Sequence, residues 1–313
     1  MEDLLKIEDL SVSFSTDAGT VEVLDRVSIH IGRGETLSLV GESGCGKSVT
    51  ASSIMRLLPH PAGKVTSGKI TFDGQDIMSL PIGDMYRIRG SSIAMIFQEP
   101  MTALNPVHLI KHQIAEVLKL HRKDIPDAKL DDYVLKYLKD VEMPSPEMRL
   151  NNYPFQLSGG MRQRVMIAMA LAGQPKLLIA DEPTTALDVT VQAQIIALIK
   201  NLQEKNNMSV MYITHDMGVV AEVSDRVAVM YAGQVVESAD VVTIFKNPRH
   251  PYTRGLIASM PKLDSKPKTR LPYIKGSVPT PRAYPATCRF ADRCSYATDY
   301  CRSNSPILED IEA

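Results

Sequence analysis

One octapeptide constrains the fold of this chain more than any other segment: Gly41-Glu42-Ser43-Gly44-Cys45-Gly46-Lys47-Ser48. It fits the pattern G-x-x-x-x-G-K-[ST], in which a glycine-rich loop cradles phosphate groups. The run before it, residues 36–40, is short and β-rich, and the run after it, residues 47–58, is compatible with a helix. A chance glycine turn rarely has this setting of strand, loop and helix. The sequence therefore predicts an α/β fold that binds a nucleotide.

The chemistry of the loop explains its residue types. Glycines allow successive backbone amides to approach phosphate oxygens, and the helix that starts near Lys47 directs its positive end at the same anion. Lys47 would neutralise the β- and γ-phosphates, and the Ser48 hydroxyl would bind Mg²⁺. Cys45 is either a redox-sensitive thiol beside a helix N-terminus or a tolerated small residue, and the second interpretation is favoured. The residues expected to contact ATP here are Gly41, Ser43, Gly44, Cys45, Gly46, Lys47, Ser48 and Val49.

A second segment supplies two carboxylates. Residues 177–180 form an apolar, strand-like run that leads directly into Asp181 and Glu182. An Asp-Glu pair alone is common on protein surfaces, but at the end of a buried strand downstream of a phosphate loop it indicates a site of ATP hydrolysis. We expect Asp181 to act on Mg²⁺ and Glu182 to polarise the attacking water.

Strands and helices alternate along most of the chain, which predicts a largely parallel sheet covered by helices. Residues 4–14 and 21–31 read as strands, and residues 105–157 read as helical from their 3.6-residue period. The later predicted elements are a helix at 161–172, a strand at 177–180, a helix at 189–204 and strands at 209–214 and 226–231. From residue 247 onward prolines recur and the periodicity fades. We therefore expect an ATPase domain at 1–246, with a helical subdomain at about 100–170, and a small loop-rich extension at 247–313.

Charge and hydropathy argue against several classes of protein. The 313 residues carry a formal net charge of −1, whereas a nucleic-acid-binding protein more often has a basic excess. No segment reaches the ~18 consecutive apolar residues of a membrane span, and the acidic N-terminus lacks the features of a secretory signal. We expect a soluble cytosolic protein that needs partner chains for any membrane work, with packed or metal-binding cysteines rather than disulfides.

The segment Leu157-Ser158-Gly159-Gly160-Met161 resembles the LSGGQ signature of the ABC ATPase family, with Met161 in the last place. It opens a predicted helix, so Ser158 and the amides of Gly159 and Gly160 would present donors at a helix N-terminus. The resemblance implies an ABC-type P-loop domain with a RecA-like core, a β subdomain and a helical subdomain. In this family two subunits sandwich ATP, so Ser158, Gly159, Gly160 and Met161 would face the ATP bound by the partner subunit.

Other landmarks of the family follow in order. Gln98 resembles the Q-loop glutamine that senses Mg²⁺ and water, and residues 186–188 resemble the D-loop. His215 resembles the switch histidine that contacts the γ-phosphate, although a single histidine at a strand end is otherwise more often structural. Phe14 is the candidate for stacking on adenine, with a place in the core as the equal alternative. The resemblance thus implies Glu182, His215 and Gln98 as catalytic residues, and Ser48, Gln98 and Asp181 as the Mg²⁺ site.

Two further segments resemble those of oligopeptide and dipeptide importers. One is QEPMTALNP at residues 98–106, and the other is NPRHPYTR at 247–254, which opens the C-terminal extension of that subfamily. The resemblance implies that ATP hydrolysis, with Mg²⁺, drives uptake of di- or oligopeptides. It also implies partners: a second ATPase subunit (identical or homologous), two transmembrane permease subunits and an extracytoplasmic peptide-binding protein. This chain would then lie at the cytoplasmic side of the inner membrane.

Three cysteines, Cys288, Cys294 and Cys301, lie close together in the loop-rich extension. Isolated cysteines are normally buried apolar residues, but three in a segment with little core suggest a metal site, and their spacing leaves zinc and iron–sulfur open. The resemblance favours a [4Fe–4S] cluster, which takes four cysteines in this subfamily. Three are present before Ala313, so the sequence is shortened, another group completes the ligand set, or no cluster forms.

Two alternatives remain for the function. The same machinery could import nickel or another small solute, because an ATPase subunit does not touch the cargo. An ABC ATPase that acts on nucleic acid or ribosomes, with the cysteines as a zinc module, is opposed by the near-neutral charge and by the His-Pro-Tyr run at 250–252.

Overall fold

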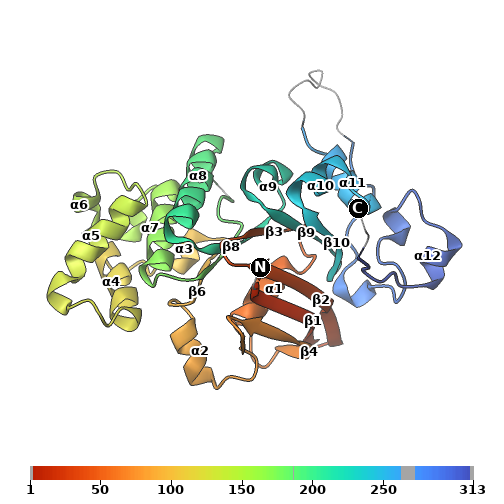
Figure 1. The fold of residues 1–313 in the computed structure, drawn as a ribbon, viewed down its shortest axis with the longest axis horizontal. Coiled ribbons are helices and arrows are strands. Elements are labelled where there is room, and N and C mark those ends of the chain that lie inside the picture. The colour runs from red at the N-terminus through yellow and green to blue at the C-terminus, as the bar shows by residue number, and fades with distance from the viewer. Residues whose placement is uncertain (1–2, 186, 262–271, 311–313) are drawn as a thin grey trace. The chain divides into compact units, whose positions relative to one another are not determined.

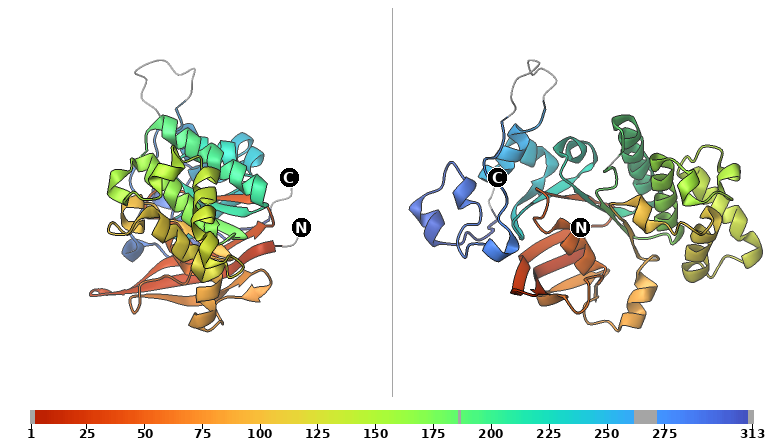
Figure 2. Two further views of the ribbon diagram at one scale, coloured as in Figure 1. Left: turned by 90° about the vertical axis from the view of Figure 1, so that its left-hand side faces the viewer. Right: turned by 180° about the vertical axis from the view of Figure 1, so that it is seen from behind.

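The computed structural model describes residues 3–185, 187–261 and 272–310. The chain separates into two compact units (Figures 1 and 2). The helical unit includes Gly32–Glu35 and Ser79–Tyr212. The phosphate-loop unit includes Asp3–Ile31, Thr36–Met78 and the residues from Ile213 onward.

The phosphate-loop unit contains two groups of strands, with the orders β2-β1-β4-β5 and β10-β9-β3. Strand β4 pairs antiparallel with both β1 and β5, whereas β3 pairs in parallel with β9. All five residues of β3 are buried, as expected for a parallel strand that is covered on both faces. The strands of this unit are β1 (Asp3–Thr16), β2 (Gly19–Gly32), β3 (Thr36–Val40), β4 (Gly63–Phe72), β5 (Gln75–Asp76), β9 (Arg226–Tyr231) and β10 (Gln234–Asp240).

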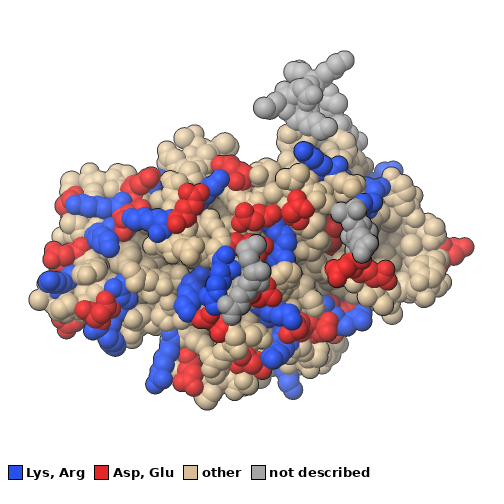
Figure 3. Space-filling view, in the orientation of Figure 1, with Lys and Arg blue, Asp and Glu red and all other residues tan. Residues whose placement is uncertain are grey.

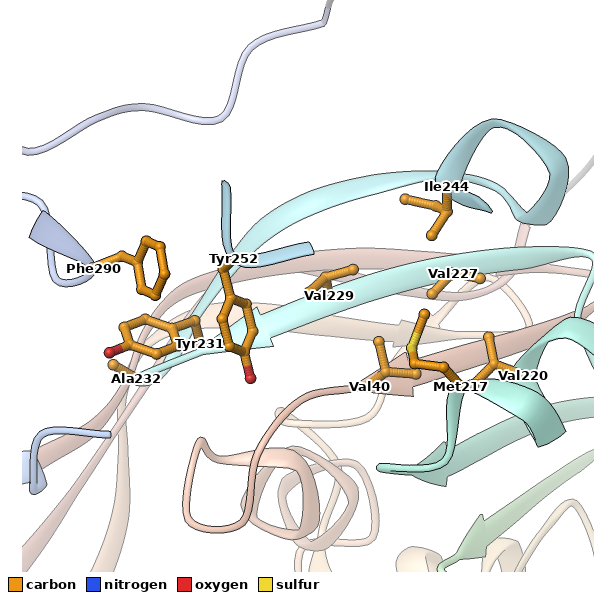
Figure 4. Close-up of a cluster of buried hydrophobic side chains, with 10 residues drawn as sticks. All are labelled: Val40, Met217, Val220, Val227, Val229, Tyr231, Ala232, Ile244, Tyr252 and Phe290. Carbon is orange, nitrogen blue, oxygen red and sulfur yellow. The ribbon is translucent and has the colours of Figure 1, made fainter. Parts of the chain in front are cut away.

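The C-terminal segments of this unit pack against its strands. A buried apolar cluster joins β3 and β9 to residues that follow β10, and Figure 4 shows Tyr231, Tyr252 and Phe290 grouped at one end of it. The cluster consists of Val40, Met217, Val220, Val227, Val229, Tyr231, Ala232, Ile244, Tyr252 and Phe290. The helices of this unit are α1 (Lys47–Ile54), α9 (Met217–Val223), α10 (Val241–Lys246), α11 (Pro251–Ala258) and α12 (Asp299–Ser303).

The helical unit is organised around α7 (Gly159–Ala172). Most residues of this helix are buried, including the polar Gln163 and Arg164, and α4 (Ile110–His121) and α5 (Leu130–Asp140) both pack against it (Figure 1). Strands β6 (Ile93–Ile96), β7 (Leu177–Asp181) and β8 (Ser209–Thr214) follow the order β8-β7-β6, with β6 and β7 parallel. The remaining helices are α2 (Ile82–Ile88), α3 (Pro100–Ala103), α6 (Pro146–Arg149) and α8 (Val189–Asn206).

The predicted α/β class is confirmed, and several elements have the predicted bounds. Strands β3, β8 and β9 occupy 36–40, 209–214 and 226–231 as predicted, whereas α1 ends at Ile54 rather than at residue 58. The helical stretch predicted at 105–157 is divided into α4, α5 and α6. Within the described ranges, no helix has the length and apolar character needed to cross a bilayer. Basic and acidic side chains are interspersed over the face drawn in Figure 3.

Candidate functional site

The phosphate loop joins β3 to α1, and its backbone conformation requires glycine. Gly46 has φ +112°, and a Cβ there would lie 2.6 Å from Leu24 Cδ2. A Cβ on Gly41 would lie 2.1 Å from the backbone oxygen of Met230. Because real Cβ atoms do not approach so closely, a side chain at either position would displace the loop.

Lys47 begins α1, and its ammonium group lies within the curve of the loop. The side chain is buried, and Nζ donates hydrogen bonds to the backbone oxygens of Gly41 (2.7 Å) and Glu42 (3.1 Å). Ser43, Gly44 and Ser48 are exposed on the loop. The loop therefore combines a fixed cation with exposed residues of a glycine-rich turn before a helix, which is the arrangement that binds phosphate groups.

Cys45 is the buried side chain of the loop. None of its surface is exposed, and burial raises the pKa of its thiol above the ordinary value. A raised pKa disfavours the reactive thiolate. The geometry thus supports the favoured interpretation of Cys45 as a tolerated small residue.

Glu182 and Gln98 meet in the helical unit. Strand β7 ends at the buried Asp181, and Glu182 follows with φ +45°. Gln98 Nε2 donates to Glu182 Oε2 (3.2 Å), and the Thr185 hydroxyl donates to the same oxygen (2.9 Å). Gln98 and Glu182 were predicted separately as catalytic residues from the family resemblance, and Thr185 was missed. The sequence signal that could have identified Thr185 is its spacing, because a threonine three residues after a carboxylate in a turn can donate a hydrogen bond to it.

The signature segment opens α7 as predicted, although the helix starts at Gly159 rather than at Met161. Ser158 is the N-cap, and its hydroxyl accepts from the Met161 amide (3.4 Å). A Cβ on Gly160 would lie 2.7 Å from Val191 Cγ1, so the start of α7 packs directly on the first turn of α8. Asp188 caps α8 by accepting from Val191 N (3.0 Å). Of the D-loop predicted at 186–188, Ala186 lies outside the described residues.

His215 and Phe14 belong to the phosphate-loop unit. His215 is exposed and follows β8, directly before Asp216, which caps α9 by accepting from Gly218 N (2.8 Å). Phe14 lies in β1 opposite Gly63, and its ring Cε1 would be 3.0 Å from a Cβ on that glycine. The half-buried ring thus covers a glycine of the neighbouring strand.

The three C-terminal cysteines give the predicted [4Fe–4S] cluster no support. Among the residues that the structure describes, no group of three or more His, Cys, Asp or Glu side chains is arranged to hold a metal ion. The thiols are engaged locally instead: Tyr296 N donates to Cys294 Sγ (3.4 Å), and the Thr298 hydroxyl lies 3.5 Å from Cys301 Sγ. Burial raises the pKa of Cys288, whereas hydrogen bonds from Thr298 lower the pKa of Cys301.

Two known family regions match the chain. The family described as ABC transporter matches residues 24–185, which is more than half of the chain. The chain belongs to the ABC transporter ATP-binding family. A second region, described as Oligopeptide/dipeptide transporter, C-terminal region, matches residues 236–301 of this ABC protein. The first region contains the phosphate loop, Gln98, the signature and Glu182, whereas Phe14 and His215 lie outside both regions.

Curated relatives of this ABC protein match it along nearly its whole length. The oligopeptide transport ATP-binding protein OppD of Bacillus subtilis is 53% identical over 294 residues, which are 94% of this chain and 82% of the relative. The dipeptide transport ATP-binding protein DppD of Haemophilus influenzae is 48% identical over 308 residues, which are 98% of this chain and 92% of the relative.

Solved structures confirm the predicted ABC-type P-loop fold. A dimeric ATP-binding cassette in a post-hydrolysis state, bound to ADP and Pi, has a TM-score of 0.68 at 29% identity and covers 76% of this chain and 98% of its own. CbiO1 of Clostridium perfringens, part of an ABC transporter complex, has a TM-score of 0.67 at 28% identity and covers 79% of this chain and 92% of its own. The chain is thus an ATPase of the ABC type.

Proposed function

We propose that this chain is the ATP-hydrolysing subunit of an importer of di- or oligopeptides. The observation that carries the proposal is the presence of both family regions in one chain, the ATPase region at 24–185 and the peptide-transporter region at 236–301. Relatives that span both regions are named for transport of oligopeptides and dipeptides.

ATP binding is assigned to the phosphate loop. The buried Lys47 supplies the positive charge that the phosphates need, and the exposed loop residues Ser43 and Gly44 would supply hydrogen-bond donors. Bound Mg²⁺ would neutralise phosphate charge, with Ser48, Gln98 and Asp181 as its proposed ligands or supports. Phe14 is proposed to stack on adenine from β1. The other phosphate contacts are assigned to Gly41, Ser43, Cys45, Gly46 and Val49.

Hydrolysis is assigned to Glu182, Gln98 and His215. The hydrogen bonds from Gln98 and Thr185 to the same Glu182 oxygen orient the carboxylate, which is what activation of a water molecule requires. His215 is proposed to contact the γ-phosphate from the end of β8. Each of these side chains is partly or fully exposed, so a nucleotide can reach it.

Ser158, Gly159, Gly160 and Met161 are proposed to bind the ATP of a partner ATPase subunit. The exposed N-terminus of α7 supports this role because the backbone amides of a first helical turn and the positive helix end attract an anion. We propose that the working assembly adds a second ATPase subunit, two permease subunits and an extracytoplasmic peptide-binding protein. The chain would act at the cytoplasmic side of the inner membrane, and hydrolysis would release the ATP-bound pair of subunits.

The domain boundaries are part of the same proposal. An ATPase domain at 1–246, with its helical subdomain at about 100–170, would be followed by an extension at 247–313. Strand β10 and α10 end just before the boundary, and α11 begins the extension at Pro251. A [4Fe–4S] cluster on Cys288, Cys294 and Cys301 is left out of the proposed mechanism. Iron and acid-labile sulfide in anaerobically purified protein would reinstate it.

The direct test of the cargo is uptake by cells that carry the complete transporter. Labelled di- and oligopeptides should accumulate with the wild-type chain and fail to accumulate with Lys47→Ala, because that variant loses the phosphate-binding cation. Uptake of labelled nickel, measured in the same pair of strains, provides the comparison. Peptide uptake that is equal in the two strains would contradict the proposed function.

A further inference from the structure

Glu42, the second residue of the phosphate loop, is held by two residues from the C-terminal part of the chain. Its backbone N–H donates to the Tyr252 hydroxyl oxygen (2.8 Å). Its carboxylate accepts two hydrogen bonds from Arg293, Nη1 to Oε2 (2.7 Å) and Nη2 to Oε1 (2.9 Å). A forked pair of this kind fixes direction as well as distance. Both the backbone and the side chain of one loop residue are therefore fixed from outside the loop.

Arg293 is itself rigidly placed. Its side chain is only 6% exposed, and Nε donates to the backbone oxygen of Lys275 (2.9 Å). The guanidinium group lies 5.6 Å from the centre of the Tyr231 ring, within range of a cation–π contact. Because the arginine side chain is buried, loss of Glu42 would leave its charge poorly compensated.

Packing also fixes Tyr252. The residue has no exposed surface, and its ring centre lies 4.7 Å from that of Tyr231 and 5.5 Å from that of Phe290. Figure 4 shows the three rings together at the end of the buried cluster. The Tyr252 hydroxyl is therefore presented to the Glu42 amide by a side chain that has little freedom to move.

A second line of contacts reaches the other side of the loop. Arg289 donates to the backbone oxygen of Ala232 (2.5 Å) and to Asp25 Oδ2 (2.6 Å). Gly233, which follows Ala232, donates its N–H to the backbone oxygen of Cys45 (2.8 Å). The turn between β9 and β10 thus lies between Arg289 and the phosphate loop.

We propose that Tyr252 and Arg293 are positioning residues of the ATP site, so that ATP affinity depends on the C-terminal extension. This inference rests on the proposed role of the loop in ATP binding. A glycine-rich loop loses much conformational entropy when it orders around phosphate groups. Contacts that hold Glu42 in place before ATP binds reduce the free energy that binding must supply to order the loop.

A double-mutant cycle on the full-length chain tests the proposal, with Mg²⁺-ATP as the probe in titration calorimetry. Arg293→Gln and Glu42→Gln should each weaken binding about tenfold, which corresponds to about 1.4 kcal/mol. The double variant should bind no more weakly than the worse single variant, because both changes remove one interaction. Arg302→Gln is the matched control, since Arg302 pairs with the exposed Asp292 (3.0 Å) in the same extension. It should bind ATP like the wild type.

Tyr252→Phe provides a second, milder variant, because it removes the hydroxyl and keeps the ring. It should weaken ATP binding about threefold, in the range of one hydrogen bond.

Variants that melt at lower temperature but bind ATP like the wild type would overturn the proposal and leave these contacts a role in folding only. Independent, additive effects of Arg293→Gln and Glu42→Gln would overturn it as well. If Arg293→Gln does not fold, the ATP affinities of Tyr252→Phe and Glu42→Gln test the proposal in its place. A wild-type chain that fails to bind ATP would instead contradict the proposed function.

Discussion

The phosphate loop and the Glu182 turn are built in opposite ways. Lys47 is only 5% exposed and bonds to the backbone of its own loop, and Glu42 is held by Tyr252 and Arg293. Glu182, in contrast, is part-exposed on a turn and receives side-chain hydrogen bonds from Gln98 and Thr185.

This difference matches two different tasks. A phosphate-binding loop gains affinity from being ordered before the anion arrives. A group that activates water must stay accessible, and its position can shift with a small movement of its neighbours. We therefore expect changes at the loop to act on ATP binding and changes at the turn to act on turnover.

Lys47→Ala should have the largest effect. Removal of the buried cation should lower kcat/KM for ATP at least about 1000-fold and abolish measurable ATP binding, because phosphate charge is no longer compensated. Titration calorimetry and a phosphate-release assay measure the two quantities. Lys64→Ala, at a position outside the loop, serves as the control. Retained ATP affinity in Lys47→Ala would contradict the role of the loop in ATP binding.

Glu182→Gln should separate binding from chemistry. The amide keeps the shape of the side chain but cannot accept a proton, so turnover should fall at least about 100-fold. ATP affinity should stay within about threefold of the wild type, because the phosphate loop, and not Glu182, is proposed to bind the phosphates of the ground state. Glu222→Gln, an exposed change on α9, controls for loss of charge. Turnover equal to that of the wild type would show that Glu182 is not the base.

Thr185→Val tests whether the hydrogen bond from Thr185 orients Glu182. Loss of the 2.9 Å hydrogen bond should let the Glu182 carboxylate rotate and should lower kcat about tenfold, with little change in KM. The neighbouring Thr184→Val is the matched control. A change in KM without a change in kcat would show that Thr185 contributes to ATP binding and not to the orientation of Glu182.

Protonation of His250 at acidic pH should lower the stability of the folded chain, and this is the smallest of the expected effects. His250 Nδ1 accepts from Tyr252 N (3.1 Å) at the start of α11, and burial lowers the pKa of His250 more than Glu237 raises it. The unfolded chain therefore takes up a proton first as pH falls below about 6.5, so stability is full above that pH and decreases below it.

The measurement is the melting temperature at about pH 7.5 and pH 5.5. Between these two pH values, the melting temperature of the wild type should fall by about 2–4 °C more than that of His250→Asn. Asparagine can cap the helix but does not titrate. An equal loss in both proteins would remove His250 as the cause.

Local patterns predicted the parts of the fold that depend on local sequence. The buried runs that form β3, β8 and β9 have the predicted bounds, and α7 begins two residues early because Ser158 caps it. Strands β4 and β10 were missed because their polar, partly exposed residues resemble loops until a partner strand pairs with them.

The candidate site was predictable for similar reasons. Contiguous motifs, such as the loop that holds Lys47 and the signature at Ser158, can be read along the chain. The contacts of Glu42 with Tyr252 and Arg293 join residues that are more than two hundred positions apart, and no local pattern marks them. The cysteine spacing suggested a cluster, but spacing alone does not fix the direction of the thiols.

The most direct test of the importer assignment is a gentle affinity purification of the tagged chain from native membranes, with mass spectrometry of the proteins that come with it. Two permease subunits, an ATPase subunit and a peptide-binding protein should co-purify with the chain. Ribosomal or DNA-repair proteins in the absence of any permease would contradict the importer assignment.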